Sequence, residues 1–247
     1  MAALSLTGMA QAGGNGKTWV DYVNPYIGNI SHLLVPTFPT VQLPNSMLRV
    51  YPERADFTAD RIHGLPLIVT HHRERSAFNL SVYCGDIGSL RDNVISYTYD
   101  NERITPYSYS AYLDGAGVQV DYSLSHQSGI YRLQTACEGV PAYLLLNSGN
   151  GSLTVKGSSV SGWQWLDAKT RVYLYAELQQ KPSQTYVLTG GKAVRGTKAE
   201  GKSACVVLAV SGGDLRLRYG VSFISTEQAR KNLQREIKTY DVETVKA

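Results

Sequence analysis

The sequence predicts an all-β fold, a large antiparallel β-sandwich that ends in a single helix. After residue 80, apolar and polar residues alternate with a period of two through most of the chain, which is typical of strands with one buried face. Clusters of Gly, Asn, Ser and Asp that favour turns recur about every 8 to 15 residues. No amphipathic helix lies between these strands, so alternating βαβ units and a dinucleotide site built on them are not expected.

Composition agrees with one large β domain. The chain has 247 residues, of which 43% are hydrophobic and 17 are tyrosine, enough to bury a substantial core. Its 24 basic and 20 acidic side chains give a net charge of +4 and are scattered along the chain. A protein that follows a phosphate backbone needs a basic stripe, so nucleic acid is not an expected partner.

The first element, residues 1–18, is expected to be an exported leader or a flexible N-terminus. Residues 1–12 are apolar or small and end in Ala10-Gln-Ala12, the A-x-A pattern of a signal-peptidase site, although a basic n-region is missing. Export would place the protein in the periplasm or outside the cell. No other stretch approaches the roughly 20 apolar residues that span a bilayer, so we expect no membrane span.

The β-sandwich is expected to occupy residues 19–224. Residues 107–113 and 118–125 alternate regularly around the turn residues 114–117, which predicts a hairpin with one buried face. Further strands are expected at residues 130–134, 142–146, 153–155, 171–177, 185–188, 204–210 and 215–223.

A helix is expected at residues 226–238, within a linker that takes up residues 225–247. Ser225 or Thr226 can cap it, and the apolar residues Ala229, Leu233 and Ile237 share one face. The apolar stripe is narrow, and the sequence offers this polar helix no evident packing partner. We therefore expect it to lead to a further domain that would hold any catalytic chemistry.

The cysteines Cys84, Cys137 and Cys205 are far apart and lie in apolar surroundings without the spacing of a metal site. Two interpretations remain. The apolar flanks favour three buried thiols, and the alternative is one disulfide with a free thiol.

Several segments, in order, resemble the N-terminal domain of glycoside hydrolase family 92, the calcium-dependent exo-acting α-mannosidases. Residues 22–28, Y-V-N-P-Y-I-G, are similar to the family's opening Y-V-N-P-F-I-G, and residues 37–39 with Pro44 and Met47 keep the spacing of its T-F-P-G-A-T-V-P-F-G-M stretch. Residues 220–225, G-V-S-F-I-S, give the sharpest match. Residues 28–36 and 64–72, which resemble the family least, correspond to its sugar-facing loops.

The resemblance implies a supersandwich of the galactose-mutarotase type, packed in family members against a helical (α/α) toroid. The catalytic carboxylates and most calcium ligands would lie in that toroid, so it implies no catalytic residue, metal ligand or cofactor in this chain. The expected partners are the toroid, in cis or as a separate chain, and a mannose-containing glycan.

Three residues are candidates for contact with a sugar. His32 aligns approximately with a histidine of the family's Gly/His loop, Phe38 could form an apolar wall for a pyranose ring, and His63 lies just before Gly64. The alternatives without sugar contact are a solvated loop histidine for His32 and His63 and core packing for Phe38. Trp163 and Trp165 share a strand face and form either a stacking platform or a structural aromatic pair.

The function expected from these features is the N-terminal β-sandwich of an exported α-mannosidase-like glycoside hydrolase. It would contribute to carbohydrate binding, be inactive alone, and expose an apolar patch where the toroid docks. The alternatives are a free-standing carbohydrate-binding module and a structural sandwich without sugar recognition.

Overall fold

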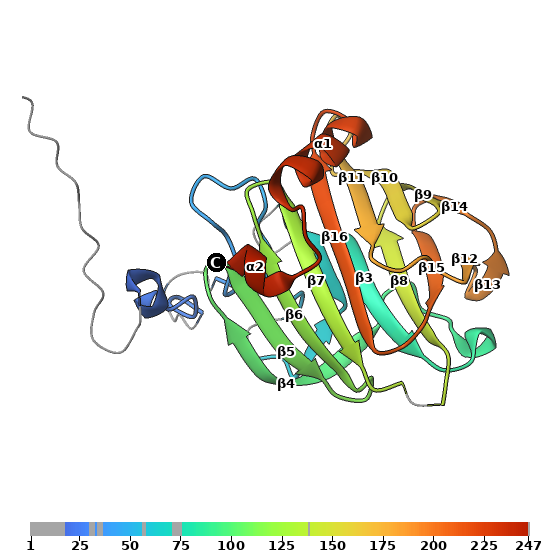
Figure 1. Ribbon diagram of the computed structural model, residues 1–247, viewed down its shortest axis with the longest axis horizontal. Coiled ribbons are helices and arrows are strands. Elements are labelled where there is room, and N and C mark those ends of the chain that lie inside the picture. Colours follow the sequence, from blue (N-terminus) through green and yellow to red (C-terminus); the bar gives the residue numbers. More distant parts are fainter. Residues whose placement is uncertain are drawn as a thin grey trace, which may run out of the picture.

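The computed structural model describes residues 18–29, 33, 37–55, 58–70, 76–137 and 139–246. Two antiparallel sheets pack face to face (Figure 1), which confirms the predicted fold class. The larger sheet has ten strands in the order β1 (Arg61–His63), β4 (Ser96–Ile104), β5 (Ser108–Leu113), β6 (Val118–Leu124), β7 (Ser128–Thr135), β16 (Asp214–Ser222), β11 (Arg171–Leu178), β10 (Ser159–Trp165), β9 (Gly151–Lys156) and β14 (Lys198–Gly201). The smaller has six, in the order β13 (Lys192–Arg195), β12 (Gln184–Thr189), β15 (Ala204–Val210), β8 (Ala142–Ser148), β3 (Ala77–Cys84) and β2 (Leu65–Ile68). Short 3-10 helices are η1 (Trp19–Tyr22) and η2 (Ile87–Ser89).

The sequence predicted many of the strands, among them β8, whose seven residues are all buried. The expected hairpin is β5 and β6, and β7, β8, β9, β11, β12, β15 and β16 coincide with the other expected strands. The sequence did not predict β1 to β4, β13 and β14; of these, β2 and the first six residues of β3 are wholly buried. The division into 1–18, 19–224 and 225–247 stays a prediction, and the leader apart from Thr18 lies outside the described residues.

Three tyrosines join the two sheets through the core. Tyr122, Tyr131 and Tyr219 come from the larger sheet and are at most 1% exposed. The Tyr131 and Tyr219 hydroxyls donate to the carbonyls of Pro66 and Leu67 in β2, each at 2.6 Å, and the Tyr122 and Tyr219 hydroxyls are hydrogen-bonded at 2.9 Å. Burial raises the pKa of all three phenols, so they act as neutral hydrogen-bonding groups between the sheets.

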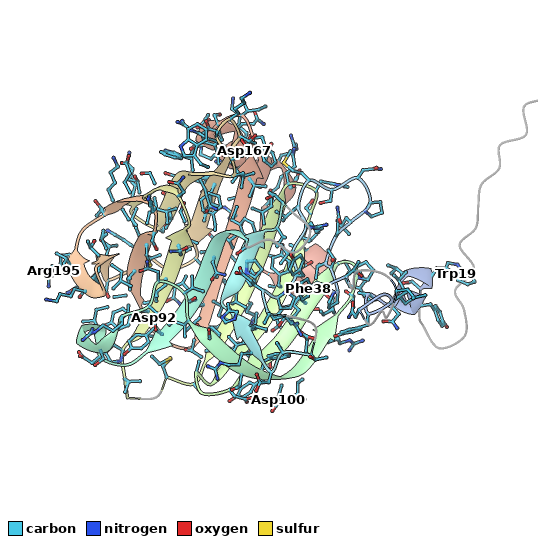
Figure 2. The ribbon with its side chains drawn as sticks, turned by 180° about the vertical axis from the view of Figure 1, so that it is seen from behind. Trp19, Phe38, Asp92, Asp100, Asp167 and Arg195 are labelled. Carbon is cyan, nitrogen blue, oxygen red and sulfur yellow. A yellow bond between two sulfur atoms is a disulfide. The ribbon has the colours of Figure 1, made fainter. Side chains whose placement is uncertain are left out.

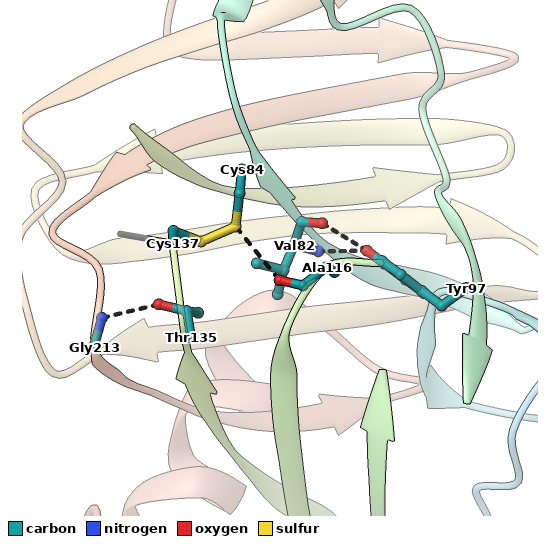
Figure 3. Close-up of a disulfide and its surroundings, with 7 residues drawn as sticks. All are labelled: Val82, Cys84, Tyr97, Ala116, Thr135, Cys137 and Gly213. Carbon is teal, nitrogen blue, oxygen red and sulfur yellow. Dashed lines mark hydrogen bonds between the residues drawn. A yellow bond between two sulfur atoms is a disulfide. The ribbon is translucent and has the colours of Figure 1, made fainter. Parts of the chain in front are cut away.

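The cysteine prediction was wrong for two of the three residues. Cys84, at the end of β3, and Cys137, just after β7, form a disulfide with their Cα atoms 5.7 Å apart (Figure 3). Apolar flanks indicated burial but carried no information on which strand ends meet. Cys205 is a buried free thiol as expected, and burial raises its pKa to about 12.

The expected helix is α1 (Thr226–Glu236), followed by the short α2 (Val242–Lys246). The Ser225 hydroxyl caps α1 by accepting from the Gln228 backbone N–H at 3.0 Å. The expectation that this helix lacks a packing partner was wrong, because α1 lies on the outer face of β16 and β11 (Figure 1). Leu233 is fully buried in a cluster with Ile130 of β7, so even a narrow apolar stripe is enough to seat the helix. None of the helices within the described residues is long and apolar enough to cross a membrane.

Asp214 is expected to contribute to stability in acid. Its carboxylate accepts from Arg216 Nη2 at 2.7 Å and from Arg132 Nε at 3.1 Å, and hydrogen bonding to Arg216 and then to Arg132 lowers its pKa from 3.8 to about 2. A carboxyl group whose pKa is lower in the folded than in the unfolded state stabilises the fold at pH values above its unfolded-state pKa. This stabilisation is lost as the pH falls through the folded-state pKa. Asp214→Asn should therefore be less stable than wild type at pH 5, with the difference vanishing near pH 2. Urea unfolding across this pH range measures it, and a constant difference would contradict the assignment.

Candidate functional site

A polar cleft of about 700 Å³ opens on the outer face of the smaller sheet. In β3 and β8 the inner residues Leu80 and Leu146 enter the core, while Asn79 and Asn147 alternate with them and line the cleft. Figure 2 labels Phe38 and Asp92, two cleft residues that lie well apart across the width of the sandwich. The remaining lining residues are Tyr51, Glu53, Arg54, Ala55, His63, Ser76, Asn93, Val94, Gly149, Gln164, Lys202 and Ser203.

Two of the three predicted sugar-contact residues meet in this cleft. Phe38 is half-buried and stacks on Tyr51, with ring centroids 5.0 Å apart and planes 14° from parallel. His63 is exposed at the end of β1, and its Nδ1 is 2.6 Å from the Ser96 hydroxyl. His32 lies outside the described residues. The roles of these residues stay predictions, but Phe38 and His63, which are 25 positions apart in the sequence, do line one cavity.

Asn79 is a cleft residue that the sequence analysis missed. Its Nδ2 donates to the His63 carbonyl at 2.8 Å, and its Oδ1 is buried without a hydrogen-bond partner among the described residues. Gly64 passes so close that a Cβ atom there would lie 1.8 Å from this oxygen, at a backbone φ of +61°. A buried acceptor without a partner costs free energy. An asparagine in an otherwise apolar strand was the signal that could have identified it.

Gln164 holds the floor of the cleft together. Its Oε1 accepts from the backbone N–H groups of Phe78 in β3 at 3.1 Å and of Gly149, after β8, at 2.9 Å. Phe78 has a φ of +60°, which is uncommon for a side chain of this size, and the bond to Gln164 supports it. The residue that follows this conformation is Asn79. One buried amide thus ties β10 to both strands that present the asparagines.

Trp163 and Trp165 lie on the other face of β10, away from the cleft. Their rings are 6.0 Å apart and nearly perpendicular, and the Arg171 guanidinium lies 4.6 and 3.8 Å from the two ring centroids. In this cation–π arrangement the guanidinium covers one face of each ring, so that face is not available to stack on a sugar. The structure therefore favours the interpretation of a structural aromatic pair.

The cleft has little net charge. Arg54, which is 8% exposed, pairs with Glu102 and donates to the Tyr99 hydroxyl at 2.6 Å. Glu53 accepts from the backbone and hydroxyl of Ser76. Among the described residues no group of three or more His, Cys, Asp or Glu side chains could hold a metal ion.

Comparisons with known proteins agree with this architecture. The sequence model described as "Glycosyl hydrolase family 92 N-terminal domain" matches residues 22–222. A comparison with curated proteins finds no match. Among solved structures, the inverting mannosidase BT2199 of Bacteroides thetaiotaomicron, a member of family GH92, is 22% identical with a TM-score of 0.75, and covers 92% of this chain and 34% of its own. The GH92 α-mannosidase BT3965 of the same organism is 18% identical with a TM-score of 0.76, over 92% of this chain and 36% of its own.

A third structure, the GH92 family glycosyl hydrolase ccman5, is 18% identical with a TM-score of 0.77, over 92% of this chain and 35% of its own. At these identities the structural likeness shows the fold, while the family assignment rests on the sequence match over most of the chain. This chain spans about one third of the length of the three enzymes. The chain belongs to glycoside hydrolase family 92, and its residues 22–222 form the N-terminal domain of that family.

Proposed function

We propose that this domain forms the sugar-binding wall of an exported α-mannosidase-like glycoside hydrolase, and that its cleft takes a sugar of a mannose-containing glycan. The observation that carries the proposal is a polar cleft of about 700 Å³ that brings the half-buried Phe38 together with the amide residues Asn79 and Asn147. Sugar hydroxyls would hydrogen-bond to the polar lining, and the apolar face of the pyranose would cover the aromatic ring. Since two anionic side chains, Glu53 and Asp92, balance the cationic Arg54 and Lys202 in the cleft lining, a neutral sugar fits it better than an acidic one.

The proposed macromolecular partner is a helical-toroid catalytic domain, in cis or as a separate chain. The segment around η1 exposes large apolar side chains, with Trp19, Tyr22 and Ile27 exposed by 74%, 64% and 77%. Figures 1 and 2 both show this segment standing clear of the sandwich. Apolar side chains gathered in this way are typical of an interaction surface. We assign this one to the part of the GH92 enzymes that this chain does not span.

Export of the protein, to the periplasm or the cell exterior, belongs to the same proposal. The bond between Cys84 and Cys137 supports it, because structural disulfides form and persist mainly in oxidising compartments. No step of the proposal uses calcium.

Binding of methyl α-mannoside, followed by NMR, tests the proposal. Phe38→Ala should weaken the affinity about tenfold, which is the size of one lost aromatic contact. Phe223→Ala is the matched control, because Phe223 is also partly exposed but lies beside α1, outside the cleft. If the sugar does not bind, or if both variants bind it as wild type does, the sugar-binding role is wrong.

A further inference from the structure

We propose that the cleft binds a chain of neutral sugars, and that a second cavity beside it holds the units that follow the first. This inference rests on the proposed function and extends it. The second cavity has a volume of about 570 Å³ and is lined by residues 91–93, the turn 189–191 between β12 and β13, and residues 198–200 with 203–204 at the adjoining strands. Ligand pockets for small molecules span about 300–1,000 Å³, so each cavity has the size of a separate binding compartment.

The two cavities are parts of one trench. Asp92, Asn93 and Ser203 line both of them. The Asn93 side-chain amide donates to the Ser203 hydroxyl and forms a polar boundary between the compartments. A ligand that passes from one compartment to the other must therefore cross polar groups, which suits a hydroxyl-rich chain.

Asp92 is the group at this boundary that remains available to a ligand. It is exposed, and no hydrogen bond or ion pair engages its carboxylate among the described residues. An ionised carboxylate has two oxygens that accept hydrogen bonds, so Asp92 can accept hydrogen bonds from the hydroxyls of sugars in both compartments.

The charges of the second compartment balance. Two cations, Arg91 and Lys198, and two anions, Asp92 and Glu200, line it, and Lys198 pairs with Glu200 at 2.8 Å. A phosphate or uronate ligand would meet two carboxylates as well as two cations. The balance favours neutral sugars.

The second compartment has a tight turn at its rim and an apolar floor. Gly190 and Gly191 adopt φ angles of +57° and +70° in the tight turn, and a Cβ atom on Gly191 would lie 3.5 Å from Arg91 Cδ. Beneath the opening, Leu188, Ala199 and Ala204 are at most 4% exposed and form an apolar floor. An apolar base with a few polar groups at the rim is typical of pockets that bind small molecules.

The experiment measures the affinity of the full chain for methyl α-mannoside and for α-linked mannobiose and mannotriose in the 1,2, 1,3 and 1,6 linkages. Wild type should bind at least one trimer ten times or more tighter than the monomer. Thr189→Trp, which fills the second compartment from an exposed position, should abolish this gain and leave monomer affinity unchanged. Asp92→Ala, a smaller change in the exposed loop, should reduce the gain as well.

Gln134→Trp is the control, because Gln134 is an exposed strand residue outside both compartments. It should keep the full gain. If wild type binds the monomer and all oligomers equally well, or if Thr189→Trp keeps the gain, the second compartment is not a sugar site and the proposed function survives. If no saccharide binds at all, both proposals are wrong.

Discussion

Replacing Glu102 with alanine is expected to lower the free energy of unfolding by about 3–5 kcal/mol. The side chains of Arg54 and Glu102 are only 3% and 12% exposed, and Arg54 also stacks over Tyr99, 4.9 Å from the ring centroid. Removing the carboxylate leaves the guanidinium charged in a place that water barely reaches. Denaturant unfolding of the purified chain, followed by circular dichroism, measures the loss. Because Arg54 lines the cleft, sugar binding should weaken in the same variant.

The matched control is Glu200→Ala. Glu200 also forms an ion pair, with Lys198, but the two side chains are 56% and 62% exposed, so its loss should cost less than about 1 kcal/mol. The double variant Arg54→Met, Glu102→Ala should be more stable than Glu102→Ala alone, since it removes the stranded charge. If Glu102→Ala is no more destabilising than Glu200→Ala, the pair contributes little to the fold.

Replacing Cys84 and Cys137 together by serine is expected to destabilise the domain by about 4 kcal/mol in the chain-entropy model of disulfides. The two cysteines are separated by 53 residues in sequence, and the bond joins the end of β3 in one sheet to the segment after β7 in the other. Without it, the unfolded chain gains freedom that the native state does not share. Unfolding in denaturant under oxidising conditions gives the difference.

A reducing agent provides the internal control. It should destabilise wild type by a similar amount and leave the double serine variant unchanged. Thiol titration of the denatured, unreduced protein should find one thiol, that of Cys205, and three after reduction. Three thiols before reduction would show that the bond is absent.

The sequence predicted the fold class because most strands of this sandwich have one buried and one less buried face. The hairpin of β5 and β6 is the clearest case, since its inward residues Tyr109, Ala111 and Leu113 recur at every second position. The same logic cannot detect β2, in which all four residues are buried. The packing of α1 against β16 could not be predicted either, because it depends on which face of the sheet the chain crosses after β16.

For the cleft, the sequence supplied individual residues but not their assembly. Phe38 and His63 were identified through a family resemblance, and they share a cavity only because the β1–β4 pairing and the 37–55 segment bring them there. Asn79 and Asn147 lie directly opposite each other in neighbouring strands, a register that links positions 68 residues apart in the sequence. Long-range strand pairing of this kind is not encoded in any local pattern.

The hydrogen bonds of Gln164 distinguish the floor of the cleft, which they fix, from the rim segments, which they do not contact. The Gln164 amide of β10 accepts backbone hydrogen bonds from Phe78 in β3 and from Gly149 after β8. The floor of the cleft therefore forms together with the sandwich. The described residues of the segments 28–36 and 64–72, which are 28, 29, 33 and 64–70, are not partners of that amide. Substitutions in these described residues can therefore change the cleft rim while the hydrogen bonds that support its floor stay intact.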